Sequence, residues 1–418
     1  MGVDFVYSAV LSRPIKPVFF YWSLFGFYSL ILLIPDSFGF FAAVLVILSL
    51  GVMLWQRPLR FLGEDRIFAC LLVAFPLLMV PSLLINGGDW SYFDYPVRAL
   101  LFIPLIVGLR SFVEPLRARG FLFFGAGTGG ITAAVFSAKS LLIDKVVRVG
   151  LPITNSIPYG QIAAILALIS FAGIFIFTTK FARFYLFAGF FASLFALYAS
   201  GSGGALLGFA AGWSIEVFLI AWRLARRQIQ KYWFIFFTIT VVILFPLFSS
   251  KFIQTVNEVA ASLDGGGMGT SNGGRFYLIL ISVKSFLANP LLGVGPGNGH
   301  QVIANYCSNH FCSPGFVNWS GVHNQYFDVL MTTGIVGLTG LLVFGLGIAW
   351  MFFSLVKRNS ANISAICGGS IVVAMLVSAF PQPLYHHNIS VISFFFTISF
   401  FWYLSSEPVE GQFLKSSA

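Results

Sequence analysis

The chain has 418 residues, of which only 9% are Asp, Glu, Lys or Arg, whereas soluble domains carry about 25% charged residues. With 58% hydrophobic residues, 50 phenylalanines and a mean hydropathy of +0.90, it has too few polar side chains to cover a soluble fold. The same composition excludes an intrinsically disordered chain, a collagen, a coiled coil and a secreted disulfide scaffold, and it predicts a polytopic membrane protein.

Twelve apolar runs are long enough to cross a bilayer, which takes about 20 residues as a helix. We expect an all-α integral membrane protein with about 12 spans, near residues 18–34, 38–55, 67–85, 97–113, 120–142, 159–178, 182–200, 203–221, 232–249, 326–353, 363–381 and 387–404. The first run lacks a small-residue cleavage site, so we expect a membrane helix there rather than a cleaved signal. Glycines recur at every fourth residue in two spans, a spacing that lets helices approach closely: Gly125, Gly129, Gly204, Gly208 and Gly212.

The net charge of +10 indicates the orientation of the chain in the membrane rather than nucleic-acid binding, because no basic run with interleaved aromatic residues is present. With the N-terminus in the cytoplasm, 17 of the 24 Lys and Arg residues fall in cytoplasmic segments. The other seven are expected outside: Arg98, Lys139, Lys145, Arg148, Lys251, Arg275 and Lys284. This asymmetry favours an even number of spans.

One connection is much longer than the others and is expected to lie outside. We therefore divide the chain into residues 1–249 with spans one to nine, the loop 250–325, and residues 326–418 with three more spans and a short cytoplasmic tail. The loop holds three of the five histidines, His300, His310 and His323. In a polytopic protein with one loop of this size, we expect the functional site to lie in that loop.

The loop contains a predicted helix from Arg275 to Leu287, which is ended by Asn289-Pro290. An amphipathic stretch at 251–263 and a glycine-rich segment at 264–274 precede it. Arg275 would lie in the first helical turn beside free backbone amides, an arrangement that suits a phosphate or pyrophosphate. An arginine that only marks the water interface fits the residue type equally well.

The glycine-rich run from Gly293 to Gly299 does not fit a dinucleotide-binding loop, because no strand pattern precedes it, no helical pattern follows it and Pro296 interrupts it. We expect tight turns that bring the backbone close to another element. Cys307 and Cys312 are expected to form a local disulfide in an oxidising compartment. A metal site is the less favoured alternative, because Cys-x4-Cys with scattered histidines is not a standard zinc spacing.

His323 lies in the sequence Gly-Val-His-Asn-Gln-Tyr-Phe-Asp, residues 321–328, just before the tenth span. A neutral imidazole near the bilayer surface can accept a proton from a hydroxyl group near neutral pH. Asn324 and Asp328 are close enough in sequence to orient it. A passive interface residue is the commoner role for a lone histidine at a membrane edge.

Four motifs follow one another between Arg275 and Leu342: Arg275 itself, Asn289-Pro-Leu-Leu-Gly-Val-Gly295, His323-Asn-Gln-Tyr-Phe-Asp328 and Gly334-Ile-Val-Gly-Leu338. Their order and spacing resemble the O-antigen ligase and polymerase superfamily, as does the twelve-span layout. The resemblance implies a GT-C-like membrane glycosyltransferase that needs no metal, cofactor or nucleotide sugar. It would take a glycan from undecaprenyl pyrophosphate on the periplasmic face of the bacterial inner membrane.

The resemblance also implies roles for individual residues. His323 would act as the general base that activates the acceptor, and Arg275 would bind the pyrophosphate and stabilise the leaving charge. One position departs from the family pattern, because Gly203 stands where the family often has an arginine in a Ser-x-Ser-Arg motif. Arg98 is the first candidate to replace that cation, ahead of Lys139, Lys145 and Arg148. His386 and His387, before the last span, could also face the substrate.

Three functions are compatible with these features. In a ligase the acceptor is a sugar hydroxyl of lipid A–core, whereas a polymerase of O-antigen or exopolysaccharide repeats would use the same donor to extend a growing glycan. A transporter is the alternative from another class, but transporters tend to show internal repeats and ionisable groups at mid-membrane. Here the halves show no repeat, and Glu216 is the only clear acidic residue inside the first nine spans. The expected partners are the lipid-linked donor, the acceptor and membrane lipids, with no nucleic acid.

Overall fold

The computed structural model describes residues 17–55, 61–224, 271–309 and 321–406, together with Ile253, residues 256–258 and 260–261, and Cys312. Every regular element in these residues is a helix, which confirms the all-α class. Before the long loop the elements are α2 (Pro17–Leu30), α3 (Ser37–Trp55), α4 (Gly63–Asn86), α5 (Ser91–Val97), η1 (Arg98–Leu101), α6 (Phe102–Phe112), α7 (Pro115–Leu142), α8 (Ser156–Ile176), α9 (Lys180–Ala199) and α10 (Gly203–Leu224). The later ones are α12 (Ser271–Ala288), α13 (Gly299–Asn309), α15 (Gln325–Arg358), α16 (Ile363–Ser378), η2 (Leu384–His386) and α17 (Asn388–Ser406).

Most of the predicted spans coincide with helices. Among the described residues, nine helices are long and apolar enough to cross a membrane, and Val18–Leu30 and Ile363–Ser378 are shorter apolar helices. The fourth predicted span is composite, because α5, η1 and α6 follow one another through Ser91–Phe112. The ninth, at 232–249, lies outside the described residues. The chain is thus a multi-pass helical membrane protein.

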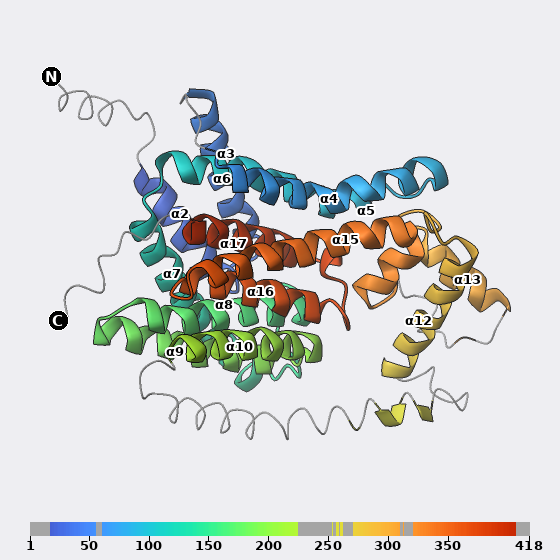
Figure 1. Ribbon diagram of the computed structural model, residues 1–418. Helices are drawn as coiled ribbons and strands as arrows, with labels where there is room; N and C mark the ends of the chain where they lie inside the picture. Colours follow the sequence, from blue (N-terminus) through green and yellow to red (C-terminus); the bar gives the residue numbers. More distant parts are fainter. Residues whose placement is uncertain are drawn as a thin grey trace.

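The helices form one bundle, with α12 and α13 together at one end of it (Figure 1). Residues of α8 and α17 are almost all buried, so these two helices form the centre of the bundle. Glycines bring neighbouring helices into contact, as predicted. A Cβ atom on Gly129 of α7 would clash with the carbonyl oxygen of Tyr28 in α2, and one on Gly212 of α10 would lie 2.5 Å from the carbonyl oxygen of Ser370 in α16.

Helix α15 is broken at Gly334, where the backbone has φ +64° and ψ −160°. Its 34 residues would span about 51 Å as a straight helix, well beyond the apolar core of a bilayer. Residues 290–295 fill the break, and the Val294 amide donates a hydrogen bond to the carbonyl oxygen of Met331 at 3.0 Å. Any side chain at Gly334 would clash with the backbone of Leu291. The break is therefore stable because a second segment satisfies the backbone groups that it frees.

The glycine-rich turn at 293–299 packs against the end of α4. Gly295 and Gly297 have φ values of +99° and +84°, which favour glycine. A Cβ atom on Gly295 would lie 2.5 Å from the carbonyl oxygen of Gly87. The Asp89 amide donates a hydrogen bond to the carbonyl oxygen of Pro296 at 2.8 Å. The prediction of tight turns against another element is confirmed. The expectation that no helix follows the run was wrong, because α13 begins at Gly299.

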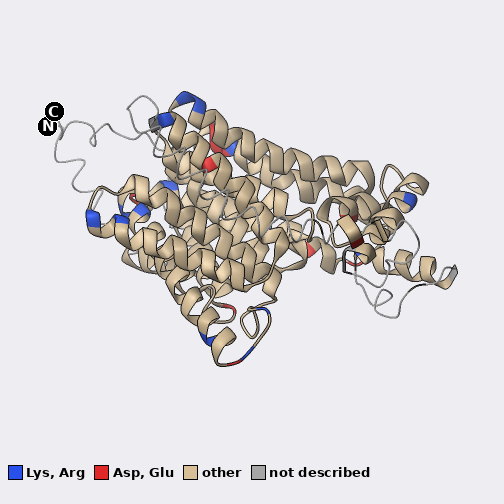
Figure 2. Cartoon of the chain, turned by 90° about the horizontal axis from the view of Figure 1, so that it is seen from below, with Lys and Arg blue, Asp and Glu red and all other residues tan. Residues whose placement is uncertain are grey.

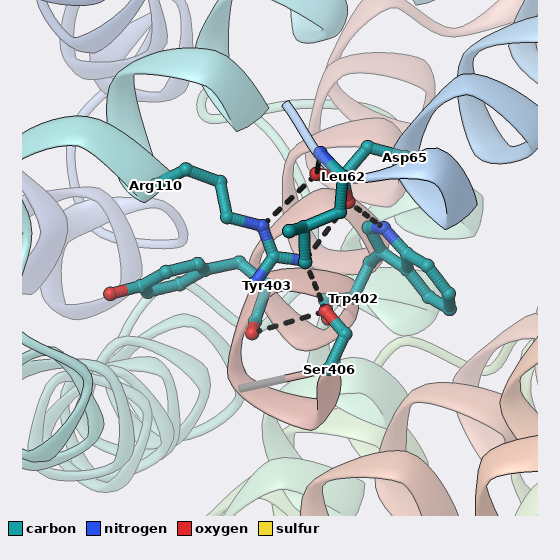
Figure 3. A network of polar contacts seen from close by, with 6 residues as sticks. All are labelled: Leu62, Asp65, Arg110, Trp402, Tyr403 and Ser406. Carbon is teal, nitrogen blue, oxygen red and sulfur yellow. Dashed lines mark hydrogen bonds and ion pairs between the residues drawn. The ribbon is translucent and has the colours of Figure 1, made fainter. Parts of the chain in front are cut away.

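Charged residues are scarce in the middle of the bundle and lie mainly at its ends and in its loops (Figure 2). The ion pair between Asp65 of α4 and Arg110 of α6 lies at one of these ends and is buried, with side chains that are 0% and 2% exposed. The Asp65 carboxylate accepts two hydrogen bonds from Arg110, at 2.9 and 3.1 Å, and one from Trp402 Nε1 at 2.8 Å. Figure 3 shows how these side chains face one another. Arg110 also donates to Ser406, so this network joins α4, α6 and α17. It lies at the start of α4, whereas the end of α4 contacts the 293–299 turn.

Candidate functional site

His323 lies between the long loop and α15, against the connection between α16 and α17. Its Nδ1 is 3.2 Å from Oε1 of Gln382. With the amide oxygen as acceptor, Nδ1 carries the hydrogen and Nε2 is the basic nitrogen. Burial lowers the pKa of His323; the Gln382 hydrogen bond opposes this effect, whereas the nearby charges of Arg275 and His386 add to it. The imidazole is therefore neutral at neutral pH and able to accept a proton.

The backbone around His323 is fixed by the N-terminal cap of α15. Oδ1 of Asn324 accepts hydrogen bonds from the amides of Tyr326 and Phe327 at 3.0 and 3.2 Å. The side-chain oxygen of Asn324, which we expected to orient His323, thus caps the helix. Oε1 of Gln325 accepts a hydrogen bond from the Tyr385 amide at 3.0 Å and ties this segment to the α16–α17 connection.

Asp328 and two further histidines lie beside His323. The Asp328 carboxylate accepts a hydrogen bond from the Val322 amide at 3.2 Å, and its other oxygen is 3.5 Å from Nε2 of His386. Burial, together with the neighbouring His386 and His323, lowers the pKa of His387 to about 4. The structure thus brings two pairs of residues that are far apart in sequence into one place, His323 with Asp328 and His386 with His387. Among the described residues, no group of three or more such side chains is placed to hold a metal ion.

Arg275 approaches His323 from α12. This helix starts at Ser271, so Arg275 lies in its second turn and not in the first turn, where we expected it. The helix ends at Ala288, before Asn289-Pro290, as predicted. Nε of Arg275 is buried without a hydrogen-bond partner. Burial lowers the pKa of Arg275, the positive charge of Arg148 lowers it further, and Glu258 raises it.

A small apolar core holds α12 beside α13 and the His323 segment. It consists of Leu278, Ile281, Ile303, Val322 and Met331. Cys307 and Cys312 are joined by a disulfide with a Cα–Cα distance of 5.4 Å, which anchors the end of α13. His300 is exposed on α13, and His310 lies outside the described residues. The position of Arg275 therefore depends on a folded unit rather than on an open loop.

Arg98 lies near the site but is engaged by its neighbours. It forms an ion pair with Asp94 and a hydrogen bond to Asn388, the residue after His387. Its guanidinium also lies 4.9 Å from the centre of the Tyr95 ring. The charge of Arg98 is thus compensated within α5 and η1.

An apolar groove runs along α15 and α16 and begins at Tyr326, next to the His323 segment. Its volume is about 540 Å³. The residues that line it are Tyr326, Phe327, Leu330, Leu338, Leu342, Leu346, Val373, Leu376, Val377 and Phe380. Phe380, which lines the groove, is two residues from Gln382, which contacts His323. The groove and His323 therefore lie at the same end of the bundle.

Gln382 is the site residue that the sequence analysis missed. It lies between Pro381 and Pro383, in a connection between two apolar runs. A polar residue within a proline-rich turn between two spans is a signal that could have identified it. The same connection supplies His386 and His387, which we did expect to face the site.

Comparison with known proteins supports the motif analysis. Residues 188–342 match the family model described as O-antigen ligase. An uncharacterized protein of Haemophilus influenzae is 26% identical over 388 residues, which cover 88% of this chain and 94% of that protein. The teichuronic acid biosynthesis protein TuaE of Bacillus subtilis is 25% identical over 195 residues, which cover 44% of this chain and 37% of that protein.

The matched segment runs from α9 into α15 and contains Ser200–Gly203, Arg275, His323 and Asp328. Gln382, His386 and His387 lie outside it and join the site through the fold. The match supports a membrane glycosyltransferase of the O-antigen ligase or polymerase type. The resemblance to the O-antigen ligase superfamily is therefore confirmed, and residues 188–342 are the part of the chain that carries it.

Proposed function

We propose that this chain transfers a glycan from undecaprenyl pyrophosphate to a sugar hydroxyl of lipid A–core, on the periplasmic face of the bacterial inner membrane. The observation that carries the proposal is the approach of Arg275 to His323, which places a partly buried cation near a neutral imidazole. These two groups match what the reaction requires. One must take a proton from the acceptor, and the other must stabilise the departing pyrophosphate.

In the proposed reaction Nε2 of His323 accepts the proton of the acceptor hydroxyl as its oxygen attacks the anomeric carbon of the donor sugar. The bond between that carbon and the pyrophosphate oxygen breaks, and undecaprenyl pyrophosphate leaves with the bonding electron pair. The guanidinium of Arg275 binds the negative charge that develops on the leaving group. The donor already carries an activated bond, so positioning and charge stabilisation are the main tasks of the protein.

The surroundings of the two residues support a lipid-linked substrate. The apolar groove between α15 and α16 begins beside His323 and is lined by hydrocarbon and aromatic side chains. A hydrocarbon chain in this groove would keep the attached pyrophosphate at the level of Arg275. Asp328, His386 and His387 would line the sugar-binding space next to His323.

A polymerase that extends a growing glycan is the second candidate. It would use the same donor and the same two residues, and only the acceptor would differ. One similar protein is named for the biosynthesis of teichuronic acid rather than of O-antigen, which favours keeping this candidate.

The function is tested by His323→Ala and Arg275→Ala in a deletion strain, with lipopolysaccharide analysed as a ladder. Both variants should insert into the membrane and lose glycan transfer. His300→Ala and Lys284→Ala are the matched controls, because these residues are exposed on α13 and α12, and they should keep transfer. Full activity of His323→Ala would contradict the proposal. In the deletion strain itself, uncapped core with free polymer indicates a ligase, whereas caps of a single repeat indicate a polymerase.

A further inference from the structure

Arg148 lies on the turn between α9 and α10, although it comes from the connection between α7 and α8. Its Nε donates a hydrogen bond to the carbonyl oxygen of Ser200 at 3.2 Å. Gly201 has φ +63°, and a Cβ atom there would lie 3.2 Å from both Cγ and Nε of Arg148. The Val149 amide donates to the carbonyl oxygen of Ala199 at 3.0 Å, which fixes the backbone beside the arginine. The side chain is thus anchored at Nε, while the residue as a whole is exposed.

This turn is packed against the connection that holds His323. A Cβ atom on Gly204 would lie 2.7 Å from Cγ of Pro381, so α10 begins in direct contact with that proline. The next residue, Gln382, is 3.2 Å from His323. Arg148 and His323 are therefore anchored to two backbone segments that touch one another.

The charge of Arg148 also acts on Arg275. The charge of Arg148 is one of the causes that lower the pKa of Arg275, after burial. Among the described residues no carboxylate forms an ion pair with either guanidinium, although Glu258 lies close enough to Arg275 to oppose the shift. Two like charges held together without an ion-paired acid favour a multiply charged anion between them.

We infer that Arg148 is the second cation that binds the pyrophosphate of the lipid-linked donor, opposite Arg275. The inference rests on the proposed function, because it assigns a further residue to the same site. Arg98 does not take this role, because Asp94 already compensates its charge. A pyrophosphate group carries charge on both phosphates, so arginines from two separate segments can each bind one.

The test is a donor titration with the purified full-length chain, in which glycan transfer from undecaprenyl-pyrophosphate-linked donor is measured. Arg148→Ala should raise the KM for the donor by about tenfold to a hundredfold, as expected for the loss of one charge-assisted contact, with a smaller effect on kcat. Lys139→Ala is the matched control. It removes a cation at the end of α7 whose ammonium group pairs with Asp144 at 2.9 Å, and it should leave KM unchanged.

Gly203→Arg in the Arg148→Ala background provides a rescue. A Cβ atom at Gly203 has no neighbour within 4 Å, so a long side chain fits there without displacing the fold. The double variant should recover most of the lost donor affinity, because it returns a guanidinium to the same space from a different segment. A purely structural role of Arg148 would not be restored in this way.

The outcomes separate this inference from the proposed function. If Arg148→Ala matches the Lys139→Ala control while His323→Ala is inactive, the inference is wrong and the proposed function stands. If Arg148→Ala lowers the melting temperature and kcat with an unchanged KM, Arg148 is structural and the inference is also wrong. If the unmodified chain transfers nothing from a pyrophosphate-linked donor, the proposed function itself fails. A rise in KM for Arg148→Ala, with recovery of KM in the double variant, supports both the inference and the proposed function.

Discussion

The basicity of His323 is set by the residues that touch it rather than by its place in a motif. A general base must be neutral before it can accept a proton, and burial favours the neutral form of the imidazole. With the Gln382 amide oxygen as acceptor, the hydrogen is held on Nδ1, and Nε2 is the nitrogen left to accept a proton. In the proposed function Gln382 is thus a positioning residue that acts through His323.

The first prediction concerns the pH dependence of transfer. Because the pKa of His323 is lowered, kcat/KM should stay constant on acidification below the usual range of histidine and fall only at lower pH, when the imidazole becomes charged. Gln382→Glu places a negative charge beside Nδ1 and should shift this fall to higher pH. Gln382→Ala should lower kcat by about tenfold with little change in KM, because the imidazole is then no longer oriented. The pH shift and the loss of kcat would both be measured in pH–rate profiles of the purified variants.

The control for these variants is Gln301→Ala, which removes an exposed glutamine on α13. Its profile should match that of the unmodified chain. If kcat/KM of Gln382→Glu falls at the same pH as in the unmodified chain, His323 is not the group whose protonation limits transfer.

Single residues could be identified from the sequence where they belong to local motifs. Contacts between residues that are distant in sequence could not. Arg275 and His323 are recognisable because each belongs to a run of characteristic residues. The contact between His323 and Gln382 joins positions 59 apart in sequence, and the position of Arg148 depends on packing between two connections. Such contacts follow from the tertiary fold, which a single sequence does not specify residue by residue.

Among the elements, α4, α6 and α17 depend on one buried ion pair at the end of the bundle that lies away from the site (Figure 3). The Asp65 carboxylate and the Arg110 guanidinium are both fully desolvated, and Trp402 donates a further hydrogen bond to Asp65. Removing one partner leaves an uncompensated charge in an apolar interior, which costs much more than the pair itself contributes.

The second prediction is that Asp65→Ala or Arg110→Ala lowers the free energy of unfolding by about 3–5 kcal/mol. Thermal and chemical denaturation in detergent would measure this loss. Replacing both residues, as in Asp65→Leu with Arg110→Met, should be less harmful than either single change, because no charge is then left unpaired. The exposed pair of Arg117 and Glu114 is the matched control, and Arg117→Ala should cost about 0–1 kcal/mol. Equal losses for the two arginines would contradict the assignment of Asp65 and Arg110 as a structural pair.

The elements were predictable where their cause is local. Apolar runs of bilayer length gave helices in the expected places because a membrane helix satisfies its own backbone hydrogen bonds. The break in α15 was not predicted, because a glycine within an apolar run also fits a continuous helix. Gly334 adopts its positive φ only because residues 290–295 fill the gap. Helix α12 also begins four residues earlier than predicted, at Ser271 instead of Arg275. The earlier start was missed because those residues belong to a glycine-rich stretch.

For the whole molecule, the distribution of charge defines two ends. Arg358 pairs with Glu64 at 2.5 Å near the buried Asp65 and Arg110, whereas α12 and α13 lie at the other end, beside His323 (Figure 1). The basic residues are unevenly divided between the two sides in the predicted topology, with 17 on one and 7 on the other. Such asymmetry orients membrane proteins with the richer side in the cytoplasm. The proposed transfer on the periplasmic face requires that orientation.

The last prediction tests this orientation with a membrane-impermeant maleimide on intact spheroplasts. Lys284→Cys on α12 should be labelled and Lys357→Cys at the end of α15 should not, because both positions are exposed but lie at opposite ends of the bundle. Cys70 and Cys367 would first be replaced by Ser, and the Cys307–Cys312 disulfide stays intact and unreactive. Permeabilised membranes, in which both sites should react, provide the control. The reverse labelling pattern would place Arg275 and His323 in the cytoplasm and refute transfer on the periplasmic face.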